Sequence, residues 1–569
     1  MKKFKVALIL LMLSSSFAVS IAQQTDGQYL RKSVSSIRDI LVKPNQIPRG
    51  TDIDEAFMSK MMRFYIEVPR FDYNNLPESV ISDFLIEVNR LDSLSTSAIG
   101  EVVFKTVAVK VREILTNPEV MEARVKGFKT EADLATFAAT KAKELTLSEA
   151  DLALLMNSAY FYLPYITRIS KSIDNDSKMV TVSIAGGMIW YQIKESPNGK
   201  VEVVEISNKS ISESYGFSQL GESRYNRFVF GNESFRTDAH NYALYDAVLT
   251  FAKNAGVLTK EIDDFKLTSQ LIEVTANTVA FNLGKKEGIH LDDGFYVKRA
   301  SENAKGDVVY REVAYVRVSK TGDNKADPSA LTKATKVIVG DSPQIGDVVF
   351  ENPRIGIDVR VKGGTTALSI PFSSIYIDKP DLTNAFNLNP DGEFTTAYML
   401  ELDLVYNISA ITGSPQTYFD LSVMLGTALA PDYEYDDTYQ PGLVSGYAGF
   451  TRKFGLRRLS LTLGLAAGAD MFSFSELGSS STDSNSSESK EEKDKYKYEF
   501  ITGGIRGVAG LELLLTPNFS FFANAGYKYT VGEEGDPQLG GLAITAGFNY
   551  SLRQLPFNPF GFLDPLKTY

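Results

Sequence analysis

Residues that commonly carry out catalysis or bind metals are scarce in this chain. It contains no cysteine and only two histidines, His240 and His290. Thiolate chemistry, zinc–cysteine sites and iron–sulfur clusters are therefore excluded, and a multi-histidine metal site is excluded in practice. Neither histidine has a partner of the kind that nucleophilic catalysis requires, and His240 could instead cap a helix. With no nucleophile–base pair, phosphate loop or metal-ligand spacing, the sequence predicts no enzymatic activity and no cofactor.

One acidic segment could bind a cation. The stretch DYEYDD places Asp432, Glu434, Asp436 and Asp437 close together. Carboxylate oxygens are the ligands that calcium prefers. An exposed acidic loop is, however, more often simply hydrated, so no metal is assigned.

The overall charge argues against a nucleic-acid partner. The formal net charge is −11 at pH 7, and the sequence pI is about 5.1. Binding to phosphate backbones requires clustered basic residues, and no Lys/Arg run follows the N-terminal lysines.

Apolar residues recur at every second position along several stretches in the C-terminal third of the chain, and charged residues fall among the positions between them. In the stretch TTAYMLELDLVYNIS, the apolar Leu400 and Leu402 alternate with the acidic Glu401 and Asp403. Such alternation gives a strand one apolar and one polar face. In a narrow interior, opposite charges should pair, because an unpaired buried charge is costly. The predicted inward-facing charged residues are Asp358, Arg360, Glu401, Asp403, Asp420, Asp470, Arg506, Glu512 and Lys528.

The alternating strands have the length that a membrane crossing requires. They run for about ten to fourteen residues, whereas strands of soluble domains average ~5–6 and tilted membrane strands need ~9–11. Their apolar faces begin and end in aromatic residues, where membrane-interface girdles lie. The predicted girdle residues are Tyr398, Tyr406, Phe419, Phe450, Phe519, Tyr529 and Tyr550.

Eight such strands are predicted between residues 354 and 552, and the connections between them alternate in length. Short joints such as KFGLR and TPN alternate with longer polar ones, among them the serine-rich run 478–495, whose role stays open. Outer-membrane barrels show this pattern because their periplasmic turns are short and their extracellular loops long. Residues 354–552 are therefore predicted to form an eight-stranded antiparallel transmembrane barrel. The alternative is a soluble sandwich or a lipocalin-like cup.

The N-terminal part of the sequence indicates that the protein is exported, and that an α/β domain follows the export signal. Three early lysines, an apolar run and small residues at Ser20 and Ala22 indicate a secretory signal peptide, residues 1–22. Residues 23–175 are predicted to be mostly helical. A hairpin follows from Met179, and a helix follows that is predicted to end at Gly256. Residues 23–265 are thus predicted to form a periplasmic α/β domain.

Residues 266–353 contain Leu283, Gly284 and Gly288 in a turn, and a late Gly346, Asp347 and Val349. With the strand-strand-helix segment before them, roughly residues 180–350 resemble a small β module and its accompanying α/β domain in flagellar assembly protein T and in curli-secretion-associated periplasmic proteins. In those modules, a strand is followed by an LG-x-x-x-G turn and a second strand, and a late GD-x-V segment closes the fold. The resemblance implies an envelope adaptor or binding module and supplies no catalytic residue. The matching positions are Val279, Phe281, Leu283, Gly284, Gly288, Gly294, Phe295, Gly346, Asp347 and Val349.

The barrel region resembles the small eight-stranded outer-membrane proteins of diderm (Gram-negative) bacteria, except that a predicted periplasmic tail, residues 553–569, follows the last strand. The predicted fold is multidomain α+β: an α/β domain, a small β module and a transmembrane barrel. The predicted function is non-enzymatic: a plugged barrel anchors a periplasmic scaffold for envelope assembly or secretion. A small transport pore is the alternative. The predicted partners are outer-membrane lipid and envelope proteins, and the oligomeric state stays open.

Overall fold

The computed structural model describes most of the chain between residues 32 and 566. The predicted signal peptide, the DYEYDD segment and the serine-rich run lie outside the described residues. The described residues are 32–51, 54–66, 71–126, 131–142, 152, 159–195, 201–221, 227–230, 232–302, 308–378, 389, 391–431, 439–476, 497–531, 537–553, 556–557, 559–560, 563 and 566.

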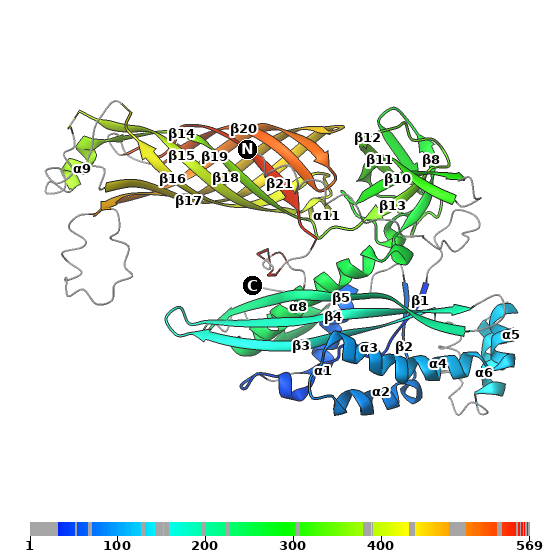
Figure 1. The fold of residues 1–569 in the computed structure, drawn as a ribbon. Helices are drawn as coiled ribbons and strands as arrows, with labels where there is room; N and C mark the ends of the chain where they lie inside the picture. The colour runs from blue at the N-terminus through cyan, green and yellow to red at the C-terminus, as the bar shows by residue number, and fades with distance from the viewer. Residues whose placement is uncertain are drawn as a thin grey trace, which may run out of the picture.

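The described chain folds into three parts: an α/β domain, a small closed β-barrel and a second, larger closed barrel (Figure 1). The α/β domain is built on a sheet of five strands in the order β2-β1-β3-β4-β5. Strand β1 runs parallel to β2 and β3, whereas β3, β4 and β5 are antiparallel. The strands are β1 (Lys32–Ser36), β2 (Phe71–Asn75), β3 (Tyr160–Asp174), β4 (Met179–Glu195) and β5 (Val201–Gln219).

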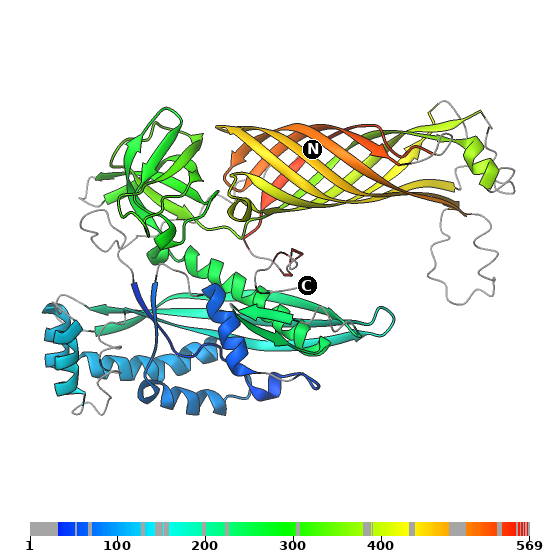
Figure 2. The ribbon, with the colours of Figure 1, turned by 180° about the vertical axis from the view of Figure 1, so that it is seen from behind.

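Helices cover both faces of this sheet, as Figure 2 also shows. Helices α1 (Glu55–Ile66) and α8 (Ala239–Glu261) contribute to a core that includes Trp190 on one face. Helices α2 (Glu78–Arg90), α3 (Thr96–Lys105) and α4 (Val107–Leu115) contribute to the core on the other face. The remaining elements are α5 (Pro118–Lys126), α6 (Glu131–Lys141), β6 (Arg227–Phe230) and β7 (Glu233–Arg236). None of the helices in the described part of the chain has the length and hydropathy needed to cross a membrane.

The prediction that residues 23–175 are mostly helical is wrong for β3. The first seven residues of this strand, Tyr160 to Ile166, are all buried, because the strand lies inside the sheet with helices on both faces. Such a strand has a continuous apolar run and no alternation, so its sequence cannot be told from that of a buried helix.

Helix α8 also differs from its prediction. It continues through Gly256 to Glu261. Gly256 is required by packing, because a Cβ there would lie 2.4 Å from the carbonyl oxygen of Tyr65 at the end of α1. The helix is capped by Asp238, whose side chain accepts a hydrogen bond from the Asn241 backbone at 2.8 Å, and not by His240.

The small barrel has six strands in the closed order β10-β11-β12-β9-β8-β13. Two glycines of its sequence motif are required by the local backbone. A Cβ on Gly284 would lie 2.4 Å from the Gly322 carbonyl oxygen, and Gly288 has a left-handed φ of 77°. Asp347 forms two hydrogen bonds of 2.9 Å with the Arg299 guanidinium. The strands are β8 (Thr268–Val274), β9 (Thr278–Phe281), β10 (Gly294–Glu302), β11 (Val308–Lys320), β12 (Thr332–Val339) and β13 (Val348–Asn352).

The large barrel confirms the predicted eight antiparallel strands. Every strand pairs with its neighbour in the sequence, and pairing between the first and last strands closes the barrel. The connections 408–416, 457–458 and 517–518 define its short-turn end, and the longer connections define its loop end. The strands are β14 (Ile357–Pro371), β15 (Glu393–Asn407), β16 (Thr417–Leu429), β17 (Tyr439–Leu456), β18 (Leu459–Glu476), β19 (Lys497–Thr516), β20 (Phe519–Thr530) and β21 (Leu542–Ser551), with the short helices α9 (Phe372–Asp378) and α11 (Ser409–Thr412) between strands.

Candidate functional site: the barrel interior and its short-turn end

The strands of the large barrel separate apolar from charged side chains. On β15, Leu400 and Leu402 point outward and are 60% and 49% exposed, whereas Glu401 and Asp403 point inward and are 1% and 3% exposed. The same division holds on the other strands, where large apolar side chains remain exposed on the outer wall. This is the reverse of a soluble barrel, whose apolar residues would fill its interior.

An ion pair crosses the barrel interior at its centre. The guanidinium of Arg506 on β19 lies 2.7 Å from Glu401 on β15, which is four strands away and therefore on the opposite wall. Arg506 also donates a 3.1 Å hydrogen bond to Ser422. Lys362 on β14 contacts Glu401 at 3.1 Å and Asp403 at 2.8 Å. These bonds join opposite walls, so the interior is filled at this level.

Two further ion pairs join strands that are not neighbours. Lys528 on β20 lies 2.8 Å from Asp470 on β18, which is 0% exposed. Asp470 also accepts hydrogen bonds from Ser445 and from the Tyr447 hydroxyl. These neutral donors satisfy the remaining acceptor capacity of the buried carboxylate, as a buried charge requires.

The second pair lies nearer the short-turn end. Lys453 on β17 contacts Glu512 on β19 at 2.6 Å, and both side chains are buried. Ser520 donates a 2.5 Å hydrogen bond to Glu512. Charge-assisted bonds of this kind are the stronger ones in a low-dielectric interior.

The structure places all nine predicted inward-facing residues on the inner wall or at its mouth. Arg360 lies 3.9 Å from Asp420, and Asp358, at the short-turn end, accepts a 3.3 Å hydrogen bond from Asn549. The sequence reasoning missed Lys362 and Lys453. Each lies two residues after an inward position and so shares its strand face, which is the signal that could have identified them.

The loop end of the interior is apolar. Phe394, Phe472 and Phe474 are all 0% exposed there. The ring of Phe394 lies 5.6 Å from that of Phe472 and 5.7 Å from that of Phe474, measured between centroids. Phe372, which opens α9, packs on Phe394 at 4.9 Å. A hydrophobic core therefore follows the ion-pair layers along the barrel axis.

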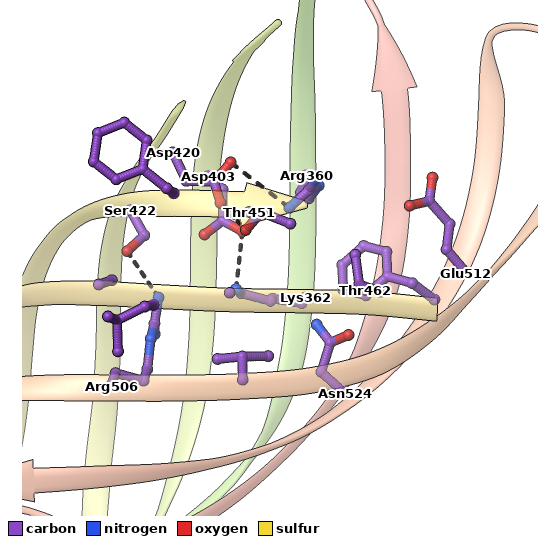
Figure 3. Close-up of a pocket in the computed structure, with 16 residues that line it drawn as sticks. Arg360, Lys362, Asp403, Asp420, Ser422, Thr451, Thr462, Arg506, Glu512 and Asn524 are labelled. Atoms are coloured by element: carbon purple, nitrogen blue, oxygen red, sulfur yellow. Dashed lines mark hydrogen bonds and ion pairs between the residues drawn. The ribbon is translucent and has the colours of Figure 1, made fainter. Parts of the chain in front are cut away.

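Little open space remains between the ion pairs. A cavity of about 40 Å³ is lined by residues that include Arg360, Lys362 and Arg506 (Figure 3). By this measure, a water molecule needs roughly 10–15 Å³, so the cavity holds about three.

The predicted girdle residues all lie on the outer wall. Tyr398 and Tyr529 lie toward the loop end and are 58% and 59% exposed. Phe450 and Tyr550 are 58% and 47% exposed. Nearer the short-turn end, the rings of Phe419 and Phe450 contact each other with centroids 5.3 Å apart. The residues toward the short-turn end are Tyr406, Phe419, Phe450, Phe519 and Tyr550.

The small barrel is attached to the short-turn end of the large one through Asp292. This residue is 8% exposed and has a left-handed φ of 68°. Its Oδ2 atom accepts hydrogen bonds from Asn407 Nδ2 at 2.9 Å, Ser409 Oγ at 2.6 Å and the Gln416 backbone at 2.6 Å. All three donors belong to one short turn, so a single carboxylate fixes that turn to the small barrel.

A polar cavity of about 190 Å³ lies at this junction. Basic and acidic residues of both barrels line it, including Arg317, Arg354 and Asp358. Burial raises the pKa of the Asp293 carboxyl in its lining above the ordinary value, and the neighbouring His290 opposes this shift. Among the described residues, no group of histidine and acidic side chains has an arrangement that could hold a metal ion.

Comparisons with known proteins identify solved barrels of the same kind. No protein-family model matches the sequence, and no curated protein matches it. Neisserial surface protein A is 15% identical over 35% of this chain and 97% of its own, with a TM-score of 0.23. Ail of Yersinia pestis is 14% identical over 34% and 98% of the two chains, with a TM-score of 0.20. The N-terminal barrel of Pseudomonas aeruginosa OprF is 14% identical over 35% and 98%, with a TM-score of 0.19.

These likenesses concern the barrel fold alone. At such identities and TM-scores, the description of residues 354–552 as a closed eight-stranded barrel rests on the strand pairing and the side-chain orientations given above. The resemblance of residues 266–353 to periplasmic assembly modules stays a prediction.

Proposed function

We propose that this chain is a non-enzymatic outer-membrane protein whose closed barrel anchors a scaffolding region in the periplasm. The observation that carries the proposal is the barrel itself: its outer wall is apolar and its interior is filled by ion pairs. The outer wall suits a hydrocarbon environment, and the interior leaves no room for a solute. The aromatic residues of the outer wall would lie at the two membrane interfaces.

The side on which the scaffold lies follows from the connections. The small barrel is attached at the short-turn end, which faces the periplasm in bacterial outer-membrane barrels. The α/β domain precedes the small barrel in the chain, so both would enter the same compartment. Both would therefore be available to periplasmic proteins of an assembly or secretion system. Their likeness to adaptor modules, predicted from the sequence, supports a binding role.

Electrical recording separates the anchor from the alternative of a small pore. The purified full-length chain in planar lipid bilayers is expected to produce no discrete single-channel openings above the protein-free background. The reason is that the Arg506–Glu401 pair, 2.7 Å long, joins opposite walls, and that an apolar core closes the loop end.

Insertion must be verified in the same preparation. The inserted barrel should keep the heat-dependent electrophoretic mobility of a folded barrel and resist added protease. A triple variant, Lys362→Ser, Glu401→Ser and Arg506→Ser, removes the central bonds and should be the first to leak if any variant does. Regular, reproducible openings from the wild-type chain would support the pore and contradict the anchor.

A further inference from the structure

We propose that the α/β domain is hinged at Lys266 and swings away from the barrel wall when the barrel enters a bilayer. The proposal rests on the outer-membrane location proposed above. It adds a movement: the large barrel and the small barrel remain one body, and the α/β domain changes its direction relative to both.

The need for a movement is steric. Figures 1 and 2 show the long sheet of the α/β domain beside the large barrel, with the turn between β3 and β4 directed toward the loop end. A bilayer around the apolar outer wall has a hydrocarbon core about 30 Å thick and must surround the barrel on every side. The sheet and the lipid cannot occupy the same space.

The hinge is a single residue between two cores. Phe265 is 0% exposed and packs on Phe71, Tyr160 and Trp190 of the α/β domain. Leu267, also 0% exposed, belongs to the core of the small barrel. Only Lys266 lies between them. A change in its backbone dihedrals would redirect the whole α/β domain without disturbing either core.

The small barrel itself does not provide the movement. Asp292 accepts three hydrogen bonds from the short turn of the large barrel. Arg354, in the connection between the two barrels, bonds to Tyr315 and to the Pro517 carbonyl. Bonds to two short turns of the large barrel favour a fixed orientation at this interface, so the bending is assigned to Lys266.

The C-terminal tail limits how far the α/β domain can travel. After β21, the Leu552 backbone donates a 2.9 Å hydrogen bond to Ile357. Pro556 then accepts a 2.6 Å bond from the Tyr215 backbone on β5, and Leu566 accepts a 2.8 Å bond from Val229. Leu566 is 2% exposed within the core of the α/β domain.

The tail therefore returns the chain to the domain where it began. Pro556 is four positions after Leu552, and an extended chain spans at most about 3.3–3.6 Å per position. While Pro556 stays bound, β5 must remain within roughly 14 Å of the barrel rim. Phe560 is 2% exposed and stacks on Tyr406 of the outer wall with ring centroids 5.1 Å apart. The permitted movement is a rotation about the rim, not a release.

Spin-label accessibility in lipid nanodiscs tests the movement. Because the chain has no cysteine, Asp176→Cys in the turn between β3 and β4 and Leu465→Cys on the outer wall each provide a unique label site. The label at Asp176 is expected to collide with a water-soluble nickel complex. The label at Leu465 is expected to collide with oxygen dissolved in the lipid and to be shielded from the nickel complex.

The two label sites distinguish a failure of the proposed hinge from a failure of the proposed membrane anchor. If both labels are shielded by lipid, the barrel is inserted but the domain has not swung, and the hinge is overturned. If the label at Leu465 meets water, the proposed membrane anchor itself is contradicted.

A second measurement tests the tail. Spin labels are placed at Asp83 and Lys325, and the distribution of distances between them is measured. The width of this distribution is expected to be at least twofold larger in Leu566→Asp than in the wild type. The matched control Ile345→Asp introduces the same charge at a side chain of the small barrel that is 72% exposed, and it should leave the spread unchanged. Equal spread in all three proteins would overturn the role of the tail.

Discussion

Replacing Lys528 with methionine is expected to lower the free energy of unfolding of the large barrel by about 3–5 kcal/mol, the usual cost of removing one partner of a buried ion pair. Asp470 is 0% exposed and lies 2.8 Å from Lys528. Without the ammonium, its charge remains buried with only hydroxyl donors. Urea unfolding in liposomes, followed by the heat-dependent change in electrophoretic mobility, measures the effect on the barrel.

The double variant Lys528→Met with Asp470→Asn is expected to recover most of this loss, because no net charge is then left buried. Arg452→Met, at an exposed outward position, serves as the control and should change the free energy of unfolding by less than about 0.5 kcal/mol. If Lys528→Met were as mild as this control, the interior would be hydrated and the closed-barrel account wrong. The single tryptophan, Trp190, lies in the α/β domain, so its fluorescence reports independently whether that domain stays folded.

The second large effect is expected on the outer wall. Leu465 is 65% exposed and lies six residues from the start of the 18-residue strand β18, near the middle of the predicted span. Leu465→Arg is expected to cost about 2–4 kcal/mol in a bilayer, as arginine does at the lipid-facing midplane. The folded fraction in liposomes across a urea series gives this value.

A matched substitution lies at the rim. Leu456 is 71% exposed beside the turn 457–458, and Leu456→Arg should cost about 0–1 kcal/mol, as near a membrane interface. In a soluble barrel, both exposed leucines would accept arginine with changes within about 0.5 kcal/mol. Equal and small effects at the two sites would therefore contradict a lipid-facing wall.

The barrel could be predicted because each strand carries a local sequence pattern that determines which side chains face outward. The period of two, the strand lengths and the alternating joint lengths together specify the faces and the closure. The inward charges followed from the same period. Lys362 and Lys453 have the same period, so the sequence carries the signal for them as well.

Other features are not encoded by a local period. Strand β3 is buried on both faces and therefore has no alternation. Gly256 lies inside α8 because another helix passes close to it, which is a tertiary contact. The pairing partners inside the barrel depend on shear and strand tilt, so the sequence indicated that charges would pair without showing that Arg506 meets Glu401.

The return of the tail to the α/β domain could also not be predicted from the sequence. Pro556 and Leu566 are separated from Tyr215 and Val229 by more than 300 positions, and the backbone atoms that join them carry no residue-specific signal. The junction at Asp292 is similar, since one carboxylate accepts bonds from a turn more than 100 positions away.

Cysteine labelling in intact cells tests the central claim most directly. Because the chain has no native cysteine, Ser486→Cys between β18 and β19, Lys325→Cys in the small barrel and Asp83→Cys in the α/β domain can be compared with a membrane-impermeant maleimide. The account predicts that position 486 is labelled in intact cells, and that positions 325 and 83 are labelled only after the outer membrane is permeabilised. Labelling of positions 325 and 83 in intact cells, or recovery of the protein in the soluble fraction, would contradict it.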